Sequence, residues 1–341
     1  MVLGALLETL VGLPGELLST SIELSLSLLV CIAFLFATMS IIALLIILVS
    51  LILASLYKIS LEKPKVDAVD QVLGPNCSVV YAHRAGALDA PENTLAAIRL
   101  AKTNKAFGVE LDLSFTKDGV AIAFHDDDLE RTTDGRGALC DHTWDEVSAL
   151  DASINHIYHD RFQKERVPKM DDAIHEALRL GLHIIIDIKA YDKQVVTYLV
   201  SLFDRTPELY EKALVASFFP QVIYSLRSER PKMVAALIWR PFYLSHKNTE
   251  ATKPRFRDSP LRQWAAELLD PLLGLAIHKF LWHVTGCSAV LIVKDCICPH
   301  YLRQWRDRDI RVLSWTPNNP VEKDYLISLG ALLYFSSILR L

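Results

Sequence analysis

The sequence predicts an α/β fold, a TIM-type (β/α)8 barrel with an inserted β-hairpin, preceded by an N-terminal transmembrane helix. The barrel is indicated by eight short apolar runs with helical patterns between them, because parallel strands need long crossover connections. The membrane helix is indicated by a long uncharged stretch near the N-terminus. Such barrels occupy about 250 residues, so a chain of 341 residues holds one barrel and an appendage.

The predicted membrane anchor covers residues 24–57. This stretch has no charged side chain and consists mainly of Leu, Ile, Val, Ala and Phe, and roughly 20 such residues span a bilayer. Residues 1–23 contain three Glu and no Lys or Arg, unlike the basic flank of a cleaved signal peptide. We expect an N-terminal tail at 1–23, an uncleaved anchor at 24–57, a polar linker at 58–77 and the barrel at 78–341.

The orientation of the anchor has two conflicting signals. Lys58, Lys63 and Lys65 follow it and nothing basic precedes it, so the positive-inside rule predicts a cytosolic barrel. Asn76-Cys77-Ser78 is a glycosylation sequon, which indicates a lumenal or extracellular barrel if it is modified. Both orientations stay open.

Composition disfavours other classes. The formal net charge is −4 and the isoelectric point is near 6.3, and Lys and Arg are scattered, so nucleic acid is not an expected partner. The six cysteines have neither a zinc-binding spacing nor the density of a disulfide scaffold. We expect buried or free thiols.

The eight expected barrel strands are residues 79–83, 109–113, 184–189, 214–217, 233–238, 289–293, 312–315 and 332–335. A further strand at 120–125 follows 109–113 after only a few residues, too few for a parallel crossover. It must therefore form a hairpin, with Asp118-Gly119 as its turn. The hairpin returns His125 to the level of Glu110 and Asp112.

Polar residues interrupt the apolar strands at one rim. Glu110 and Asp112 are two apart on one strand, so both side chains point to the same face, at the barrel end where active sites lie. Two such carboxylates repel each other unless a cation lies between them, and Mg²⁺ or Ca²⁺ prefers oxygen ligands. Asp187 ends another strand and supplies a third oxygen, and Lys189 can meet phosphate charge.

His83 and Arg84 end the first strand at the same rim. Arg84 and a metal would clamp the oxygens of a phosphodiester, and His83 with His125 would form an acid/base pair. A single His at a strand end is more often structural, and Glu-x-Asp is common in strands. The coincidence of these groups at one rim favours a site.

Several ordered motifs carry a resemblance to a known family. They are His83-Arg84-Ala85-Gly86, Ala90-Pro91-Glu92-Asn93-Thr94, Val109-Glu110-Leu111-Asp112, Phe124-His125-Asp126, Arg131-Thr132-Thr133-Asp134-Gly135, Asp187-Ile188-Lys189 and Trp315-Thr316-Pro317-Asn318. From about Val79 to the C-terminus the chain resembles the glycerophosphodiester phosphodiesterase family.

The resemblance implies metal-dependent hydrolysis of glycerophosphodiesters, such as glycerophosphoinositol or glycerophospho-N-acylethanolamine, to glycerol 3-phosphate and an alcohol, in phospholipid metabolism. The resemblance implies that His83 and His125 act as general base and acid, and that Glu110, Asp112 and Asp187 are the metal ligands. It implies that Arg84 and Lys189 contact the phosphate and that Trp315 packs on the glycerol. Glu92 and Asn93 are expected to brace the first loop. The implied metal is Mg²⁺ or Ca²⁺, and the implied partners are a small glycerophosphodiester and membrane lipid.

Two alternative functions stay open: a lysophospholipase D acting on lysophospholipids, and a catalytically impaired membrane interaction protein.

Ala85 stands where the family usually has Gly, so we expect its backbone to avoid positive φ. Residues 240–286 form an insertion, in which 264–285 is apolar but broken by Pro271 and Gly274. We expect this part either to lie on the bilayer or to pack on the barrel.

Overall fold

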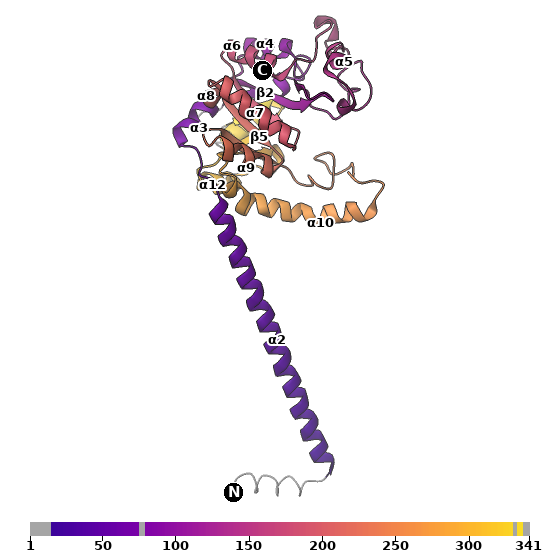
Figure 1. Ribbon diagram of the computed structural model, residues 1–341, viewed down its shortest axis with the longest axis vertical. Coiled ribbons are helices and arrows are strands. Elements are labelled where there is room, and N and C mark those ends of the chain that lie inside the picture. Colours follow the sequence, from indigo (N-terminus) through magenta and orange to yellow (C-terminus); the bar gives the residue numbers. More distant parts are fainter. Residues whose placement is uncertain (1–14, 75–78, 330–332, 337–341) are drawn as a thin grey trace. The chain divides into compact units, whose positions relative to one another are not determined.

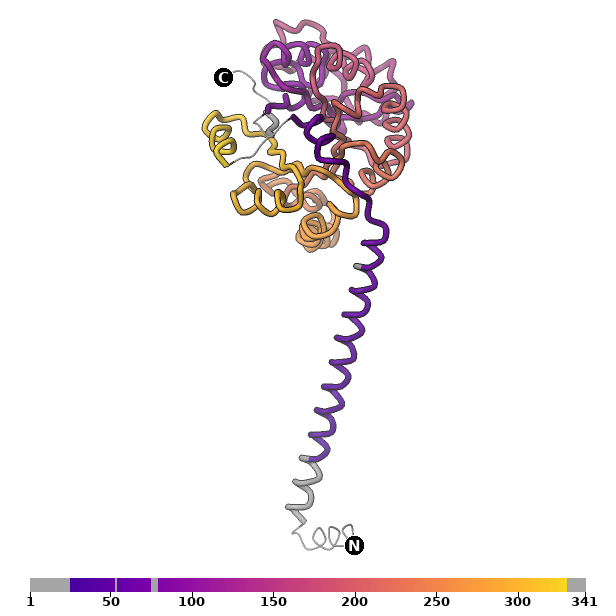
Figure 2. Tube along the Cα trace, turned by 90° about the vertical axis from the view of Figure 1, so that its left-hand side faces the viewer, coloured from indigo at the N-terminus to yellow at the C-terminus, as the bar shows by residue number. Residues whose placement is uncertain are grey.

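The computed structural model describes residues 15–74, 79–329 and 333–336 of the chain (Figure 1). The chain divides into two units, Met1–Ile59 and Ser60–Leu341. The described residues of the first unit form one uninterrupted helix, α2 (Gly15–Ile59), whose course is visible in Figures 1 and 2. Its segment Ser25–Ile59 is 35 residues long and reaches a mean hydropathy of 3.0. By length and composition it could cross a membrane, as predicted.

The second unit is the predicted barrel. Its eight parallel strands are β1 (Val79–Ala82), β2 (Gly108–Phe115), β4 (His183–Ile188), β5 (Ala213–Ser217), β6 (Val234–Trp239), β7 (Ala289–Val293), β8 (Arg311–Trp315) and β9 (Leu333–Ser336). Each pairs with the next, and β9 pairs with β1, which closes the sheet on itself. The strands are predominantly apolar because side chains are buried both inside the barrel and under the surrounding helices, and polar residues interrupt β2 and β4.

The predicted hairpin is present. Strand β3 (Ala121–Ala123) runs antiparallel to β2, with Leu113 opposite Ala123. Gly119 has φ +80 and donates its N–H to Thr116 O at 2.9 Å, which closes the turn. The Phe124 N–H donates to Asp112 O at 2.9 Å, so the next residue, His125, is delivered to the level of Asp112.

Helices cover the outside of the barrel (Figure 1). Their bounds are α4 (Leu95–Thr103), α5 (Trp144–Ser148), α6 (Met170–Arg179), α7 (Lys193–Arg205), α8 (Leu209–Lys212), α9 (Pro220–Glu229), α12 (Pro299–Arg306) and α13 (Pro320–Ser328). Thr94 shows how the sequence starts one of them: its hydroxyl accepts the Ala97 N–H at 3.2 Å and caps α4. Inside the barrel, strand side chains such as Ile185 and Leu214 form a separate core.

The expected linker at 58–77 is wrong in part, because it contains the helix α3 (Val66–Leu73). Val69, Val72 and Leu73 recur at helical spacing and are buried in the core inside the barrel. The side chain of His183, at the start of β4, bonds to Val72 O at 2.8 Å, so α3 covers the N-terminal end of the barrel. The prediction relied on the polar composition and the two prolines of this stretch and missed the short apolar stripe. The sequon at 76–78 lies outside the described residues.

The insertion before β7 is a continuous helical segment, α10 (Pro260–Ala276), η4 (Ile277–Leu281) and α11 (Trp282–Val284). The expectation that Pro271 and Gly274 break it is wrong. Pro271 lies within α10 at an exposed position. Gly274 is buried against Trp239, where a Cβ would lie 3.4 Å from Cζ2, an ordinary van der Waals contact.

Candidate active site

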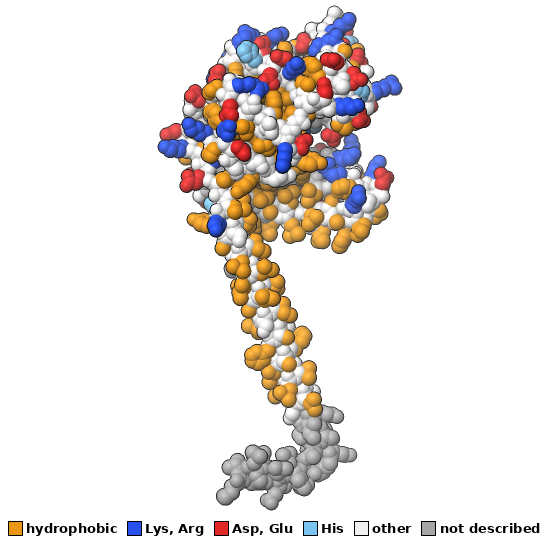
Figure 3. All heavy atoms as spheres, viewed as in Figure 1, with side chains coloured by type: hydrophobic (Ala, Val, Ile, Leu, Met, Phe, Trp, Pro, Cys, Tyr) orange, Lys and Arg blue, Asp and Glu red, His pale blue; other side chains and the backbone are white. Residues whose placement is uncertain are grey.

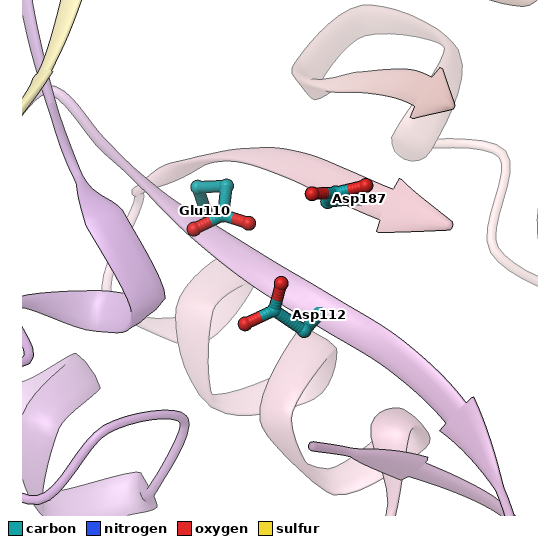
Figure 4. Close-up of side chains that lie close together, drawn as sticks. All are labelled: Glu110, Asp112 and Asp187. Atoms are coloured by element: carbon teal, nitrogen blue, oxygen red, sulfur yellow. The ribbon is translucent and has the colours of Figure 1, made fainter. Parts of the chain in front are cut away.

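Three carboxylates meet at the C-terminal end of the barrel. Glu110 and Asp112 project from β2 and Asp187 from the neighbouring strand β4, where the register pairs Asp112 with Asp187 (Figure 4). All three residues are buried. One oxygen from each lies within 4.8 Å of the others, so the structure brings together the three residues that the sequence singled out as metal ligands.

The pKa values of the three carboxyl groups are shifted in different directions. Burial and the charges of Asp112 and Asp187 raise the pKa of Glu110 well above its ordinary value, and burial also raises the pKa of Asp187. Burial alone would raise the pKa of Asp112, but the charges of Lys189, His125 and Arg84 outweigh it and hold that pKa well below its usual range. Three buried acids in such proximity are stabilised by positive charge.

Lys189 supplies part of that charge. Its Nζ lies 3.0 Å from Asp112 Oδ1 and 2.6 Å from Asp187 Oδ2. Among the described residues, Asp187 Oδ1 is buried and accepts no hydrogen bond. An unsatisfied buried oxygen within a set of three hard oxygen donors fits a divalent cation such as Mg²⁺ or Ca²⁺.

His83 and Arg84 lie in η1 (His83–Ala85), directly after β1. Arg84 has φ +51 and Ala85 has φ +61, so the expectation that Ala85 avoids positive φ is wrong. This left-handed turn directs the Arg84 N–H onto Glu110 Oε2 at 2.6 Å. His83 Nε2 lies 4.0 Å from the same oxygen. Burial and the neighbouring Arg84 charge hold the pKa of His83 well below its ordinary value. Such backbone strain is typical of functional sites.

Two residues of the first loop brace the site. Asn93 donates from Nδ2 to Asp112 Oδ2 at 2.8 Å, and its Oδ1 accepts the Asp112 N–H at 3.2 Å. Glu92 accepts from Arg84 Nη1 at 3.0 Å and from both terminal nitrogens of Arg131 at 2.8 and 2.7 Å. The Asp112 carboxylate and the Arg84 guanidinium are therefore fixed by neighbours on this loop and by Arg131.

His125 is oriented by the next residue. Its Nδ1 lies 2.5 Å from Asp126 Oδ1, and Asp126 also accepts from Arg131. Burial would raise the pKa of Asp126, but these two hydrogen bonds hold it far below its usual range. An ionised Asp126 accepts hydrogen bonds only, so His125 carries a proton on Nδ1 and its Nε2 remains for chemistry. The sequence reasoning assigned no role to Asp126, although a carboxylate beside a candidate His is the signal for one.

The remaining wall of the site is aromatic. Trp315 ends β8 at the same rim, and its buried indole N–H has no acceptor among the described residues. Phe218 and Tyr243 are stacked, with ring centroids 4.3 Å apart. Burial raises the pKa of Tyr243. Phe218 follows β5 directly, and Ser217, the last residue of β5, pairs with Ile188 next to Asp187, so the stacked pair lies at the same rim as the carboxylates. The sequence gave no signal for Tyr243, which comes from the insertion.

Comparisons with known proteins agree on one family. The profile described as "Glycerophosphoryl diester phosphodiesterase family" matches residues 83–332. Glycerophosphodiester phosphodiesterase 1 of Mus musculus is 43% identical over 272 residues, 79% of this chain and 81% of that protein. The protein of the same name from Homo sapiens is 41% identical over 256 residues, 75% of this chain and 76% of that protein.

Solved structures agree on the fold. A phosphodiesterase of Oleispira antarctica in complex with the product sn-glycerol-3-phosphate has a TM-score of 0.58 at 22% identity, over 76% of this chain and 93% of that one. A glycerophosphodiester phosphodiesterase of Agrobacterium tumefaciens has a TM-score of 0.59 at 22% identity, over 77% and 97%. With the family profile matching most of the barrel, the chain belongs to the glycerophosphoryl diester phosphodiesterase family and is an enzyme of that family.

Proposed function

We propose that this enzyme hydrolyses glycerophosphodiesters, such as glycerophosphoinositol or glycerophospho-N-acylethanolamine, to glycerol 3-phosphate and an alcohol. The observation that carries the proposal is the convergence of Glu110, Asp112 and Asp187 within 4.8 Å, beside the His83 and His125 side chains at the mouth of the barrel. Carboxylates that hold a cation and two histidines of different environment are the groups that phosphodiester cleavage requires.

The proposed mechanism has two steps. His83 accepts the proton of the glycerol hydroxyl next to the phosphate, whose oxygen attacks phosphorus, while His125 donates a proton to the departing alcohol oxygen. The P–O bond to the alcohol breaks and a cyclic glycerol phosphate forms. In the second step the histidines exchange roles, and water opens the ring to glycerol 3-phosphate. The low pKa of His83 keeps this residue neutral, as a base must be.

The other site residues bind and orient the substrate. The Arg84 guanidinium and the Lys189 ammonium neutralise the phosphate, and Trp315 packs on the glycerol. A divalent cation on the three carboxylates supplies Lewis-acid polarisation of the phosphate when bound. We propose Mg²⁺ rather than Ca²⁺, because Glu110, Asp112 and Asp187 would hold the ion with only three protein residues, and Mg²⁺ is bound by few carboxylates whereas Ca²⁺ takes more oxygen ligands.

Product analysis tests the reaction. The purified full-length protein is incubated with glycerophosphoinositol and Mg²⁺, and separately with the analogue in which the hydroxyl next to the phosphate is methylated. We expect glycerol 3-phosphate and inositol from the first and no cleavage of the second. Release of inositol phosphate instead would refute the assigned cleavage bond, and turnover of the methylated analogue would refute attack by the glycerol hydroxyl.

The runner-up is a lysophospholipase D activity on intact lysophospholipids. It is favoured by the helix α2, which is long and apolar enough to hold the enzyme in a membrane. Turnover of lysophosphatidylinositol equal to or faster than that of glycerophosphoinositol would reverse the order. A membrane interaction protein without activity would turn over neither substrate at any metal concentration.

We further propose that α2 anchors the enzyme in a membrane of the cell surface or an endomembrane, with the barrel on the lumenal or extracellular side. The sequon at 76–78 supports this side, whereas Lys58, Lys63 and Lys65 favour the cytosolic one. Protease treatment of sealed vesicles distinguishes them. The barrel should be protected in vesicles with their cytosolic face outward, and its digestion there would refute the lumenal placement.

A further inference from the structure

The helix α10 has an apolar outer face. It is formed by Leu261, Trp264, Leu268, Leu269, Leu272 and Leu275, which repeat at helical spacing and are each between 49% and 75% exposed. Figure 3 shows these hydrophobic side chains as a continuous band along the helix. Apolar patches of this extent on a domain surface mark interaction sites.

The opposite face of α10 is fixed on the barrel. Ala266, Asp270 and Gly274 recur every four residues and are buried. Asp270 accepts the backbone N–H groups of Leu244 at 2.7 Å and of Ser245 at 3.2 Å, and also the Ser245 hydroxyl. The packing of this polar and small-residue face leaves the apolar outer face directed away from the barrel.

The chain itself brings this segment to a bilayer. The candidate span ends at Ile59, and two residues later the Leu61 N–H donates to Val284 O at 3.1 Å, at the end of the α10–η4–α11 segment. A Cβ at Gly286 would lie 2.6 Å from Leu61 O, so the two segments are in close contact there. Because two residues reach at most about 7 Å, the chain tethers the end of this helical segment within that distance of the end of the candidate span.

We propose that the outer face of α10 lies in the interfacial region of the bilayer that anchors the chain. The occupant is lipid, because the attachment at Val284 fixes one end of the segment near the membrane. The composition also fits, since Trp264 is a residue typical of the membrane interface. Basic side chains flank the apolar face, with Arg257 and Arg262 near the start of α10 and Lys279 beyond its end, as in helices that bind anionic bilayers in the plane of the interface.

The same helix reaches the candidate active site. Asp270 holds Leu244 and Ser245, which follow Tyr243, and the Tyr243 ring is stacked on Phe218. Phe218 follows β5 at the rim of the barrel, where Ser217 pairs with Ile188 next to Asp187. Membrane contact of the outer face would therefore place the aromatic wall of the site next to lipid. On the basis of the proposed function, we infer that α10 admits substrates whose alcohol group is held in the bilayer by an acyl chain.

Lipid contact is tested without activity. The full-length protein is placed in nanodiscs of phosphatidylcholine and phosphatidylserine that contain a photoactivatable phospholipid, and labelled peptides are identified by mass spectrometry. We expect labels on residues 260–281 as well as on α2, and none on Val321 and Tyr325, which are 74% and 55% exposed on α13. Labelling of α2 alone would overturn the proposal. So would a dimer in the nanodisc that shields α10 from the lipid, because the occupant would then be a second copy.

A second measurement tests the substrate inference. The variant Leu268→Glu, Leu272→Glu replaces two outer-face side chains, and Val321→Glu, Tyr325→Glu is its matched control. We expect the outer-face variant to lose about tenfold or more of its turnover of bilayer-held glycerophospho-N-acylethanolamine, with turnover of soluble glycerophosphoinositol unchanged. Equal losses on both substrates, or no loss on either, would refute the inference. Inactivity of the unmodified enzyme on both substrates would instead refute the proposed function.

Discussion

The left-handed turn after β1 can be tested by replacing two alanines with glycine. Ala82 and Ala85 are both buried, 0% and 1% exposed, so each substitution removes an equivalent methyl group. Their backbones differ, because Ala82 has φ −76 and Ala85 has φ +61. The pair therefore separates the effect of the positive φ from the effect of lost packing.

The expected magnitudes follow from these two quantities. Loss of a buried methyl group costs about 0.8 kcal/mol, and the added freedom of glycine in the unfolded chain costs roughly 0.5–1 kcal/mol. Ala82→Gly should therefore destabilise the barrel by about 1.5 kcal/mol. At Ala85 the relief of a left-handed conformation returns roughly 1–2 kcal/mol, so Ala85→Gly should leave the free energy of unfolding nearly unchanged.

Thermal unfolding of the detergent-purified protein measures the difference. One kcal/mol corresponds to a Tm shift of about 3 °C for a domain somewhat smaller than this barrel. We expect Ala82→Gly to lower the Tm by about 4 °C and Ala85→Gly to leave it unchanged within error, with activity retained. A Tm decrease for Ala85→Gly as large as that for Ala82→Gly would refute the assigned strain.

Three further predictions concern the site and its supports. Because the pKa of His83 is lowered, the imidazole stays neutral at mildly acidic pH, and kcat/KM should begin to fall only below about pH 6.5. A fall of kcat/KM that begins at or above about pH 6.5 would contradict this. Asp126→Asn should lower kcat roughly 100-fold with little change in KM, because His125 loses its orientation. Asp160→Asn is the control at an exposed carboxylate, and an equal loss of kcat there would show that the effect is non-specific. Asp270→Ala should destabilise the insertion by about 3 kcal/mol because buried donors lose their acceptor, and Asp270→Asn should destabilise it less. Equal Tm values for the two variants would refute the role of Asp270 as a hydrogen-bond acceptor.

Much of the fold could be predicted because it depends on local patterns. The apolar strand runs and the Asp118-Gly119 turn are encoded within short windows, and the period of two places Glu110 and Asp112 on one face. Asp187 could be assigned to the same site because the carboxyl ends of parallel strands share one rim. These inferences need no knowledge of which side chains pack together.

The features that were missed depend on long-range packing. The apolar stripe of α3, formed by Val69, Val72 and Leu73, is too short to outweigh the signal of the nearby prolines. These side chains are buried against the core inside the barrel, which exists only once the sheet has closed. Pro271 lies at an exposed position within α10, and the helix continues past it to Ala276. The stacking of Tyr243 on Phe218 joins the insertion to β5, and no local pattern could reveal it.

The most direct test of the account is metal-dependent release of glycerol 3-phosphate from glycerophosphoinositol, with Mg²⁺, with Ca²⁺ and with chelator. It compares the unmodified protein with Glu110→Gln, Asp112→Asn and with Glu211→Gln, a matched change on the exposed surface of α8. We predict release with metal, none with chelator, none in the double variant, and full activity in Glu211→Gln. Release that persists with chelator, or in a folded double variant, would contradict the three-carboxylate metal site.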